Sequence, residues 1–146
     1  MRFARELTGG LSVLAAVLWL GAAPAVAAEL RVKVTGLRST DGAVHFALYD
    51  GARGFPTEAG KIGGTKVKAV AGGVVAVFSS LAPGTYAVAV YHDENGNGAF
   101  DQGLFGLPLE DYGFSNDAPV WFGPPDFAEA AFAVEGKVIE IAIRLD

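Results

Sequence analysis

The sequence predicts an all-β fold, namely a single antiparallel two-sheet sandwich of the immunoglobulin-like or transthyretin-like kind. Two observations lead to this prediction. Apolar and polar residues alternate along most of residues 29–146, and the alternating runs end at Gly, Pro, Asp or Asn, as half-buried strands do. No long stretch has the helical period of about 3.6 residues, so the strands are expected to bury their apolar faces against a second sheet.

Six or seven short runs have the alternation, each of roughly five to nine residues. A weak strand near residues 65–70 completes the expected set. The apolar positions of the other runs, in chain order, are Leu30, Val32 and Val34; Val44, Phe46 and Leu48; Val75 and Val77; Tyr86, Val88 and Val90; Phe132 and Val134; and Ile139, Ile141, Ile143 and Leu145.

The connections between these runs are rich in turn-forming residues. Residues 40–42 (Thr-Asp-Gly) and 135–137 (Glu-Gly-Lys) each lie between two alternating runs, so both are expected to be hairpin turns. The only helix signal is at residues 126–131. There the Asp126 side chain can cap the first turn, and the Glu129 side chain can accept the backbone N–H of Asp126 in return. We therefore expect at most one short helical turn.

The first 28 residues are predicted to be a cleavable secretory signal. Arg2 and Arg5 precede an apolar run, and small residues follow up to Ala28, which is the order of regions in such a signal. We expect cleavage after Ala27 or Ala28 and one mature β-sandwich domain, residues 29–146, in the periplasm or outside the cell. The rival interpretation is a retained membrane anchor, because the apolar stretch just reaches the length of a spanning helix; the Gly and Pro within it favour cleavage.

Composition restricts the partners and the compartment. The chain has no cysteine, and an exported protein without disulfides fits a bacterial envelope. Residues 1–28 carry two of the eleven basic residues and one of the sixteen acidic ones, so the mature domain is more acidic than the whole chain, whose formal charge is −5. Without a Lys/Arg cluster, neither nucleic acid nor membrane insertion after cleavage is expected. An envelope protein or a small ligand remains as the partner.

The one chemical motif is at residues 93–101, directly after an expected strand. Oxygen-bearing side chains occupy its positions 1, 3, 5 and 9, and Gly98 occupies position 6, which matches the first part of a calcium-binding loop. Calcium takes about six to eight oxygen ligands. The expected ligands are the side chains of Asp93, Asn95, Asn97 and Asp101 and the carbonyl oxygen of Ala99.

This loop departs from an EF-hand in two ways. Its twelfth position is Leu104, where an EF-hand has a bidentate Glu, and the sequence predicts no flanking pair of helices. The remaining oxygens would come from water or from Glu110, Asp111 and Asp117. We therefore expect at most a weak Ca²⁺ site, with a dissociation constant of roughly 0.1–1 mM. The alternative is a metal-free connection, because Asn-Gly pairs are also strong turn signals.

No catalytic constellation is apparent, so the domain is predicted not to be an enzyme. His45 lies among outward-facing strand residues, and we expect it to be solvated. His92 ends a strand beside Asp93, where it could orient the loop or bind a metal. The serines, Ser115 among them, lack the Gly-x-Ser-x-Gly context of an activated nucleophile.

Residues 102–125 form a long segment that breaks the alternation. Segments of this length in a compact domain are usually functional, unless the assignment of elements is wrong. The aromatic residues either pin the loop over the end of the sandwich or line a pocket for a sugar, peptide or lipid. The pocket would make the chain a small-ligand-binding protein, which is the alternative function. These aromatic residues are Phe105, Tyr112, Phe114, Trp121 and Phe122.

Several motifs together resemble one bacterial family, called domain of unknown function 2141. The resemblance covers nearly the whole mature chain in order, and it implies an exported protein of one small β-sandwich to which no activity is assigned. The motifs are residues 81–98 (LAPGTYAVAVYHDENGNG), 106–108 (GLP), 112–116 (YGFSN) and 123–127 (GPPDF).

Two details qualify this resemblance. Residues 83–86 (Pro-Gly-Thr-Tyr) are also similar to transthyretin-like and collagen-adhesin B-type modules, which are mostly structural or binding units. Leu109 and Asp111 flank Glu110 where the family pattern would have Lys and Gly. This departure removes a basic residue from the loop and favours an additional acidic calcium ligand.

Overall fold

The computed structural model describes residues 26–145. The expected signal peptide, residues 1–28, therefore lies outside the described residues except for its last three. Strand β1 (Ala28–Thr35) begins at Ala28, whose side chain is buried and which pairs with Leu81. A cut after Ala27 would leave this core residue on the mature domain, whereas a cut after Ala28 would remove it.

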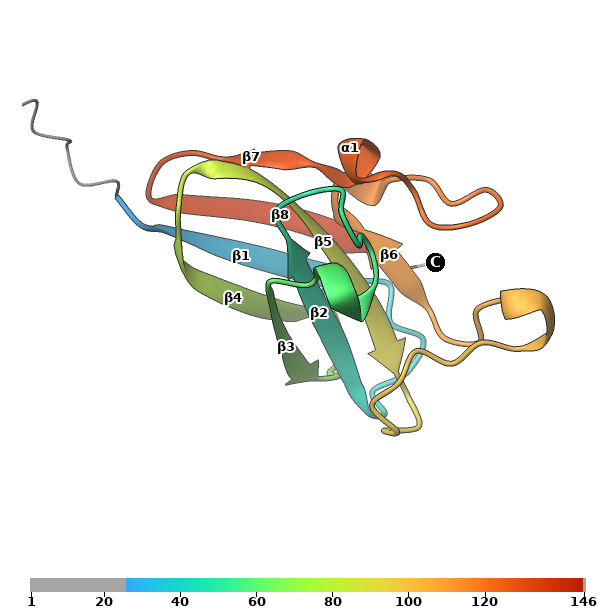
Figure 1. The fold of residues 1–146 in the computed structure, drawn as a ribbon. Helices are drawn as coiled ribbons and strands as arrows, with labels where there is room; N and C mark the ends of the chain where they lie inside the picture. Colours follow the sequence, from blue (N-terminus) through green and yellow to red (C-terminus); the bar gives the residue numbers. More distant parts are fainter. Residues whose placement is uncertain (1–25, 146) are drawn as a thin grey trace, which may run out of the picture.

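Eight strands of the described residues form two sheets that pack face to face (Figure 1). The predicted all-β, two-sheet sandwich is confirmed, including the weak strand near residues 65–70. The three-stranded sheet has the order β4–β1–β8, with β4 at Val74–Leu81 and β8 at Val138–Arg144. The other sheet has the order β3–β2–β5–β6, and β7 also pairs with β5. Its strands are β2 (Ala43–Tyr49), β3 (Gly63–Lys68), β5 (Gly84–Asp93), β6 (Tyr112–Phe114) and β7 (Phe132–Val134).

Helical structure in the described part of the chain is limited to single turns. Helix α1 (Phe127–Ala130) is the expected one, and its predicted capping box of Asp126 and Glu129 is present, with the N–H of Asp126 donating to Glu129 Oε2 at 2.8 Å. None of the helices between residues 26 and 145 is long and apolar enough to cross a membrane. The 3₁₀ turns are η1 (Glu58–Gly60), η2 (Leu104–Gly106) and η3 (Ser115–Asp117).

The main core lies between the inner faces of the two sheets. The alternation identified these faces correctly for β1, β2 and β5. Burial of each large aliphatic side chain contributes about 1.5–3 kcal/mol, so this cluster is the main source of stability. Its buried members from the predicted runs include Leu30, Val32, Val34, Val44, Phe46, Leu48, Tyr86, Val88, Val90, Val134, Ile143 and Leu145.

In strand β4, the residues that face the core are not the predicted Val75 and Val77 but their neighbours. Val75 and Val77 are 50% and 48% exposed, whereas Val74 and Ala76 are buried. Residues 74–78 are apolar at both parities, so the pattern alone does not determine which side faces inward.

Both predicted hairpins are wrong. Residues 40–42 connect β1 to β2, and residues 135–137 connect β7 to β8, and in each case the two strands belong to different sheets. The turns carry the chain across the sandwich because turn chemistry is local and does not choose the sheet that receives the next strand. Strands β1 and β8 are also parallel neighbours, whereas the other strand pairs among the described residues are antiparallel.

One edge of β5 is covered by two short strands with a gap between them. β6 pairs with residues 89–91 and β7 with residues 84–86. In the gap, the fully buried Ser115 accepts the N–H of Val88 at 2.9 Å and donates to the carbonyl of Ala130 at 2.5 Å. The Ser115 hydroxyl thus replaces a missing ladder contact.

Candidate metal centre

Strand β5 ends at Asp93, the first residue of the predicted calcium loop. The Asp93 side chain is buried, and its carboxylate accepts three backbone N–H groups: Gly96 at 2.7 Å and Asn97 at 3.1 Å on Oδ1, and Gly98 at 2.8 Å on Oδ2. Gly96 and Gly98 have φ values of 71° and 77°, which glycine adopts without strain. The loop is therefore wound around the Asp93 carboxylate.

His45 lies beside this carboxylate on the outer face of the five-stranded sheet. Its Nε2 is 3.2 Å from Asp93 Oδ2, and its ring stacks on Tyr91 with the centroids 4.7 Å apart. The expected outward direction is correct, and the side chain is 22% exposed, so the histidine is partly solvated. The contact is diagonal, because Tyr91 is the direct cross-strand partner of His45 and Asp93 lies two residues further along.

Three other side chains of the loop converge on one another. The Asp101 carboxylate accepts Nδ2–H groups of Asn95 at 2.6 Å and of Asn97 at 2.9 Å. Ala99 is held in the same loop, because its N–H donates to Asn97 Oδ1 at 2.9 Å. The structure therefore gathers positions 3, 5 and 9 of the predicted motif. Rotation of the two amides would turn their oxygens, instead of their NH₂ groups, toward Asp101.

Glu110 brings a further carboxylate to this loop from outside it. The N–H of His92 donates to the carbonyl of Asp111 at 2.8 Å, which extends the β5–β6 ladder to the residue before β6. The Glu110 side chain is 7% exposed; its Oε2 accepts the N–H of Asp101 at 3.1 Å, while its buried Oε1 has no hydrogen-bond partner. An unpartnered buried carboxylate oxygen is costly, and this one belongs to a carboxylate held against a loop with calcium-type spacing.

The electrostatics of the two buried carboxylates differ. Burial by itself raises the pKa of Asp93, but the N–H groups of Gly98 and Gly96, together with His45, hold that pKa below its ordinary value. Burial raises the pKa of Glu110. The hydrogen bond from the N–H of Asp101 partly offsets this rise, and the charges of Asp101 and Asp93 raise the pKa of Glu110 further. A cation placed among these groups would favour the ionised form of Glu110.

The other acidic candidates lie elsewhere. Asp111 forms an ion pair with Arg38, with Nε 2.5 Å from Oδ2. Asp117 Oδ1 accepts the N–H of Arg144 at 2.9 Å and so holds η3 against β8. The structure therefore assigns Asp111 and Asp117 other partners, and of the three downstream candidates it brings Glu110 to the loop.

His92 is on the inner side of the same strand. It is fully buried, and its Nε2 is 2.7 Å from the carbonyl oxygen of Asp41. Its Nδ1 has no hydrogen-bond partner and is 4.0 Å from Glu94 Oε1. Successive strand residues point to opposite faces, so His92 closes the end of the core while Asp93 faces the loop.

The arrangement suits a hard cation. Asp93, Asn95, Asn97, Ala99, Asp101 and Glu110 offer about six oxygen-donating groups, the lower limit for calcium. Between residues 26 and 145, no three His, Cys, Asp or Glu side chains form a metal-binding group, so the candidate depends on amide and carbonyl oxygens, which calcium accepts. The loop is also closed by its own hydrogen bonds, as the metal-free alternative predicts.

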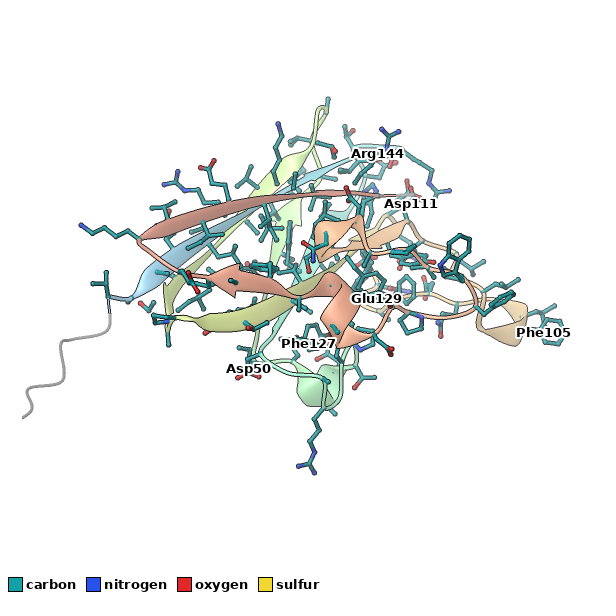
Figure 2. The ribbon with its side chains drawn as sticks, turned by 90° about the horizontal axis from the view of Figure 1, so that it is seen from above. Asp50, Phe105, Asp111, Phe127, Glu129 and Arg144 are labelled. Atoms are coloured by element: carbon teal, nitrogen blue, oxygen red, sulfur yellow. The ribbon has the colours of Figure 1, made fainter. Side chains whose placement is uncertain are left out.

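The aromatic residues of the long loop fall into two groups. Tyr112 and Phe114 pack over the outer face of the five-stranded sheet, where Phe114 contacts Phe55 with the ring centroids 5.9 Å apart. Phe105, in contrast, lies at the far end of its loop and points away from the sandwich (Figure 2). Trp121 and Phe122 are also exposed. The hollow beside Tyr112 has about 170 Å³, less than the roughly 300 Å³ or more of common ligand pockets, and the small-ligand alternative stays a prediction.

The comparison with known families identifies the chain. The model of the family described as "Uncharacterized protein conserved in bacteria (DUF2141)" matches residues 32–142. The chain belongs to this family. The DUF2141 match includes both strands that flank the candidate site, β5 and β6, and all six residues that would supply its oxygens. No curated protein and no solved structure matches the chain.

Proposed function

We propose that this DUF2141 protein is an exported, non-catalytic β-sandwich module in which one calcium ion joins the 93–101 loop to Glu110. The observation that carries the proposal is the buried, unpartnered Oε1 of Glu110 in a carboxylate held against a loop with calcium spacing. The apolar leader at residues 1–28 supports export. Calcium outside the cytoplasm is abundant enough for a site with a dissociation constant of roughly 0.1–1 mM to be filled.

The ion would act on structure. Residues 102–109 leave the sandwich at Asp101 and return at Glu110, so a calcium ion bound by both residues would fix the two ends of that segment. It would also relieve the repulsion among the carboxylates of Asp93, Asp101 and Glu110. That repulsion adds to burial in raising the pKa of Glu110.

Thermal unfolding of the mature chain in calcium and in EGTA tests the proposal. At a calcium concentration about 100 times the dissociation constant, binding adds about 2.7 kcal/mol to the free energy of unfolding, which raises Tm by roughly 10 °C for a domain of this size. Identical melting curves in calcium and EGTA contradict the site.

Glu110→Gln is the matched variant. It preserves the shape of the side chain and an oxygen for the N–H of Asp101, but it removes a charge that burial and the neighbouring carboxylates disfavour. The variant is therefore expected to be at least as stable as the wild type in EGTA and to lose most of the calcium-induced rise in Tm. A variant that keeps the full rise excludes Glu110 as a ligand.

A further inference from the structure

Residues 102–109 form a finger whose two ends lie in the candidate calcium site. The N–H of Leu109 donates to the carbonyl of Asp101 at 3.0 Å, and the N–H of Gly103 donates to the carbonyl of Leu107 at 2.8 Å. An isolated antiparallel β-bridge between Gln102 and Pro108 completes this narrow hairpin. The finger is thus continuous with Asp101 at one end and with Glu110 at the other.

The finger carries apolar side chains that nothing in the described chain covers. Phe105 is 98% exposed, and Leu104, Leu107 and Leu109 are each more than half exposed. Phe105 also has a φ of 61°, a left-handed conformation unfavourable for a residue with a Cβ atom. Such an outlier points to a functional constraint, because an exposed ring gains no packing in return.

A second apolar loop, residues 118–125, extends at the same end of the molecule. Figures 1 and 2 show it beside β6 and α1, on the same side of the sandwich as the amber turn η2 at the end of the finger. Its outer residues are Trp121, which is 81% exposed, and Phe122, which is fully exposed. Neither the finger nor this loop contains a charged residue.

We infer that the finger and this second loop insert into the interfacial region of a phospholipid bilayer when calcium is bound at the base of the finger. Convex, uncharged tips of Leu, Phe and Trp can enter a bilayer without burying a charge, and Trp is favoured at the interface. A protein partner would have to supply a fitted pocket for each tip. This inference rests on the proposed calcium site.

Charge makes the attachment dependent on calcium. Residues 93–129 contain eight acidic residues and no Lys or Arg, and Arg38 and Arg144 lie beside them. This end of the calcium-free molecule is therefore net acidic and repels anionic headgroups. A calcium ion with about six protein oxygens can take one or two more ligands, and headgroup phosphate oxygens fit that need. The sequence predicts no membrane insertion because the chain lacks a Lys/Arg cluster. A bound calcium ion and the two apolar loops supply the attraction to the bilayer that basic residues would otherwise provide.

Trp121 is a built-in probe for this inference, because the other tryptophan, Trp19, lies in the leader. The mature chain is mixed with vesicles of phosphatidylcholine and phosphatidylglycerol in calcium or in EGTA. We expect the emission of Trp121 to shift to the blue and the protein to co-sediment in calcium, with both effects reversed by EGTA. Leu104→Ser with Phe105→Ser is expected to lower the partitioning on the order of a hundredfold, while the calcium-induced rise in Tm remains.

Three outcomes overturn the inference. If calcium raises Tm but vesicles change neither the emission nor the sedimentation, the calcium site stands and the bilayer attachment fails. If the emission shifts without vesicles as protein concentration rises, and the double variant abolishes the shift, the loops cover a second copy of the chain. If vesicles bind equally in EGTA, calcium plays no part in attachment.

Discussion

Asp93→Ala is expected to lower the free energy of unfolding by about 3 kcal/mol. The Asp93 carboxylate is buried, it is the common acceptor for the N–H groups of Gly96, Asn97 and Gly98, and it lies 3.2 Å from His45. Hydrogen bonds to a charged acceptor are the stronger ones, and alanine would leave all three donors without it. Denaturant unfolding in EGTA measures this effect apart from any metal.

Two comparison variants define the origin of that loss. Asp93→Asn retains one acceptor oxygen, so it should cost less than Asp93→Ala. Asp50 directly follows strand β2 but is exposed, and Asp50→Ala should change stability by less than about 0.5 kcal/mol. A loss for Asp93→Ala no larger than that for Asp50→Ala would contradict the view that the loop is built around the Asp93 carboxylate.

Ser115→Ala is expected to be destabilising by about 2–3 kcal/mol. The Ser115 hydroxyl is the acceptor for the N–H of Val88 and the donor to the carbonyl of Ala130, in the gap where neither β6 nor β7 pairs with β5. Alanine fills nearly the same space but leaves both buried backbone groups without these partners.

Equilibrium unfolding of Ser115→Ala beside Ser79→Ala provides the comparison. Ser79 is exposed on β4, so its replacement should be nearly neutral. Amide hydrogen exchange adds a local readout, because the Val88 amide should exchange faster in Ser115→Ala while amides of β1 keep their relative protection. Equal stability of the two variants would show that the gap in the β5 edge is satisfied in another way.

The strands could be predicted from the sequence, but their partners could not. Alternation at Leu30, Val32 and Val34 reports which side of a strand is buried, and burial follows directly from side-chain chemistry. Pairing depends on where the whole chain goes, and the turn at residues 40–42 has the same local chemistry whether β2 returns to the same sheet or crosses to the other. The parallel β1–β8 pair joins the two ends of the domain, which no local signal specifies.

In the candidate site, the loop could likewise be predicted from the sequence, but its contacts with distant residues could not. Spacing alone located the loop, because oxygen-bearing side chains at positions 1, 3, 5 and 9 with glycine at position 6 are a local pattern. The choice of Glu110 over Asp117 required the β5–β6 register, which brings Glu110, two residues before β6, alongside the loop. The contact of His45 with Asp93 was missed because it joins two strands that are far apart in sequence.

A calcium titration of the isotope-labelled mature chain, followed through backbone amide chemical shifts, tests the proposed site most directly. We expect saturable shifts with a dissociation constant of roughly 0.1–1 mM, confined to residues 93–101 and to the residues around Glu110, and greatly weakened in Glu110→Gln. Shifts that do not saturate, or that centre on another part of the sandwich, would contradict a calcium ion held between the 93–101 loop and Glu110.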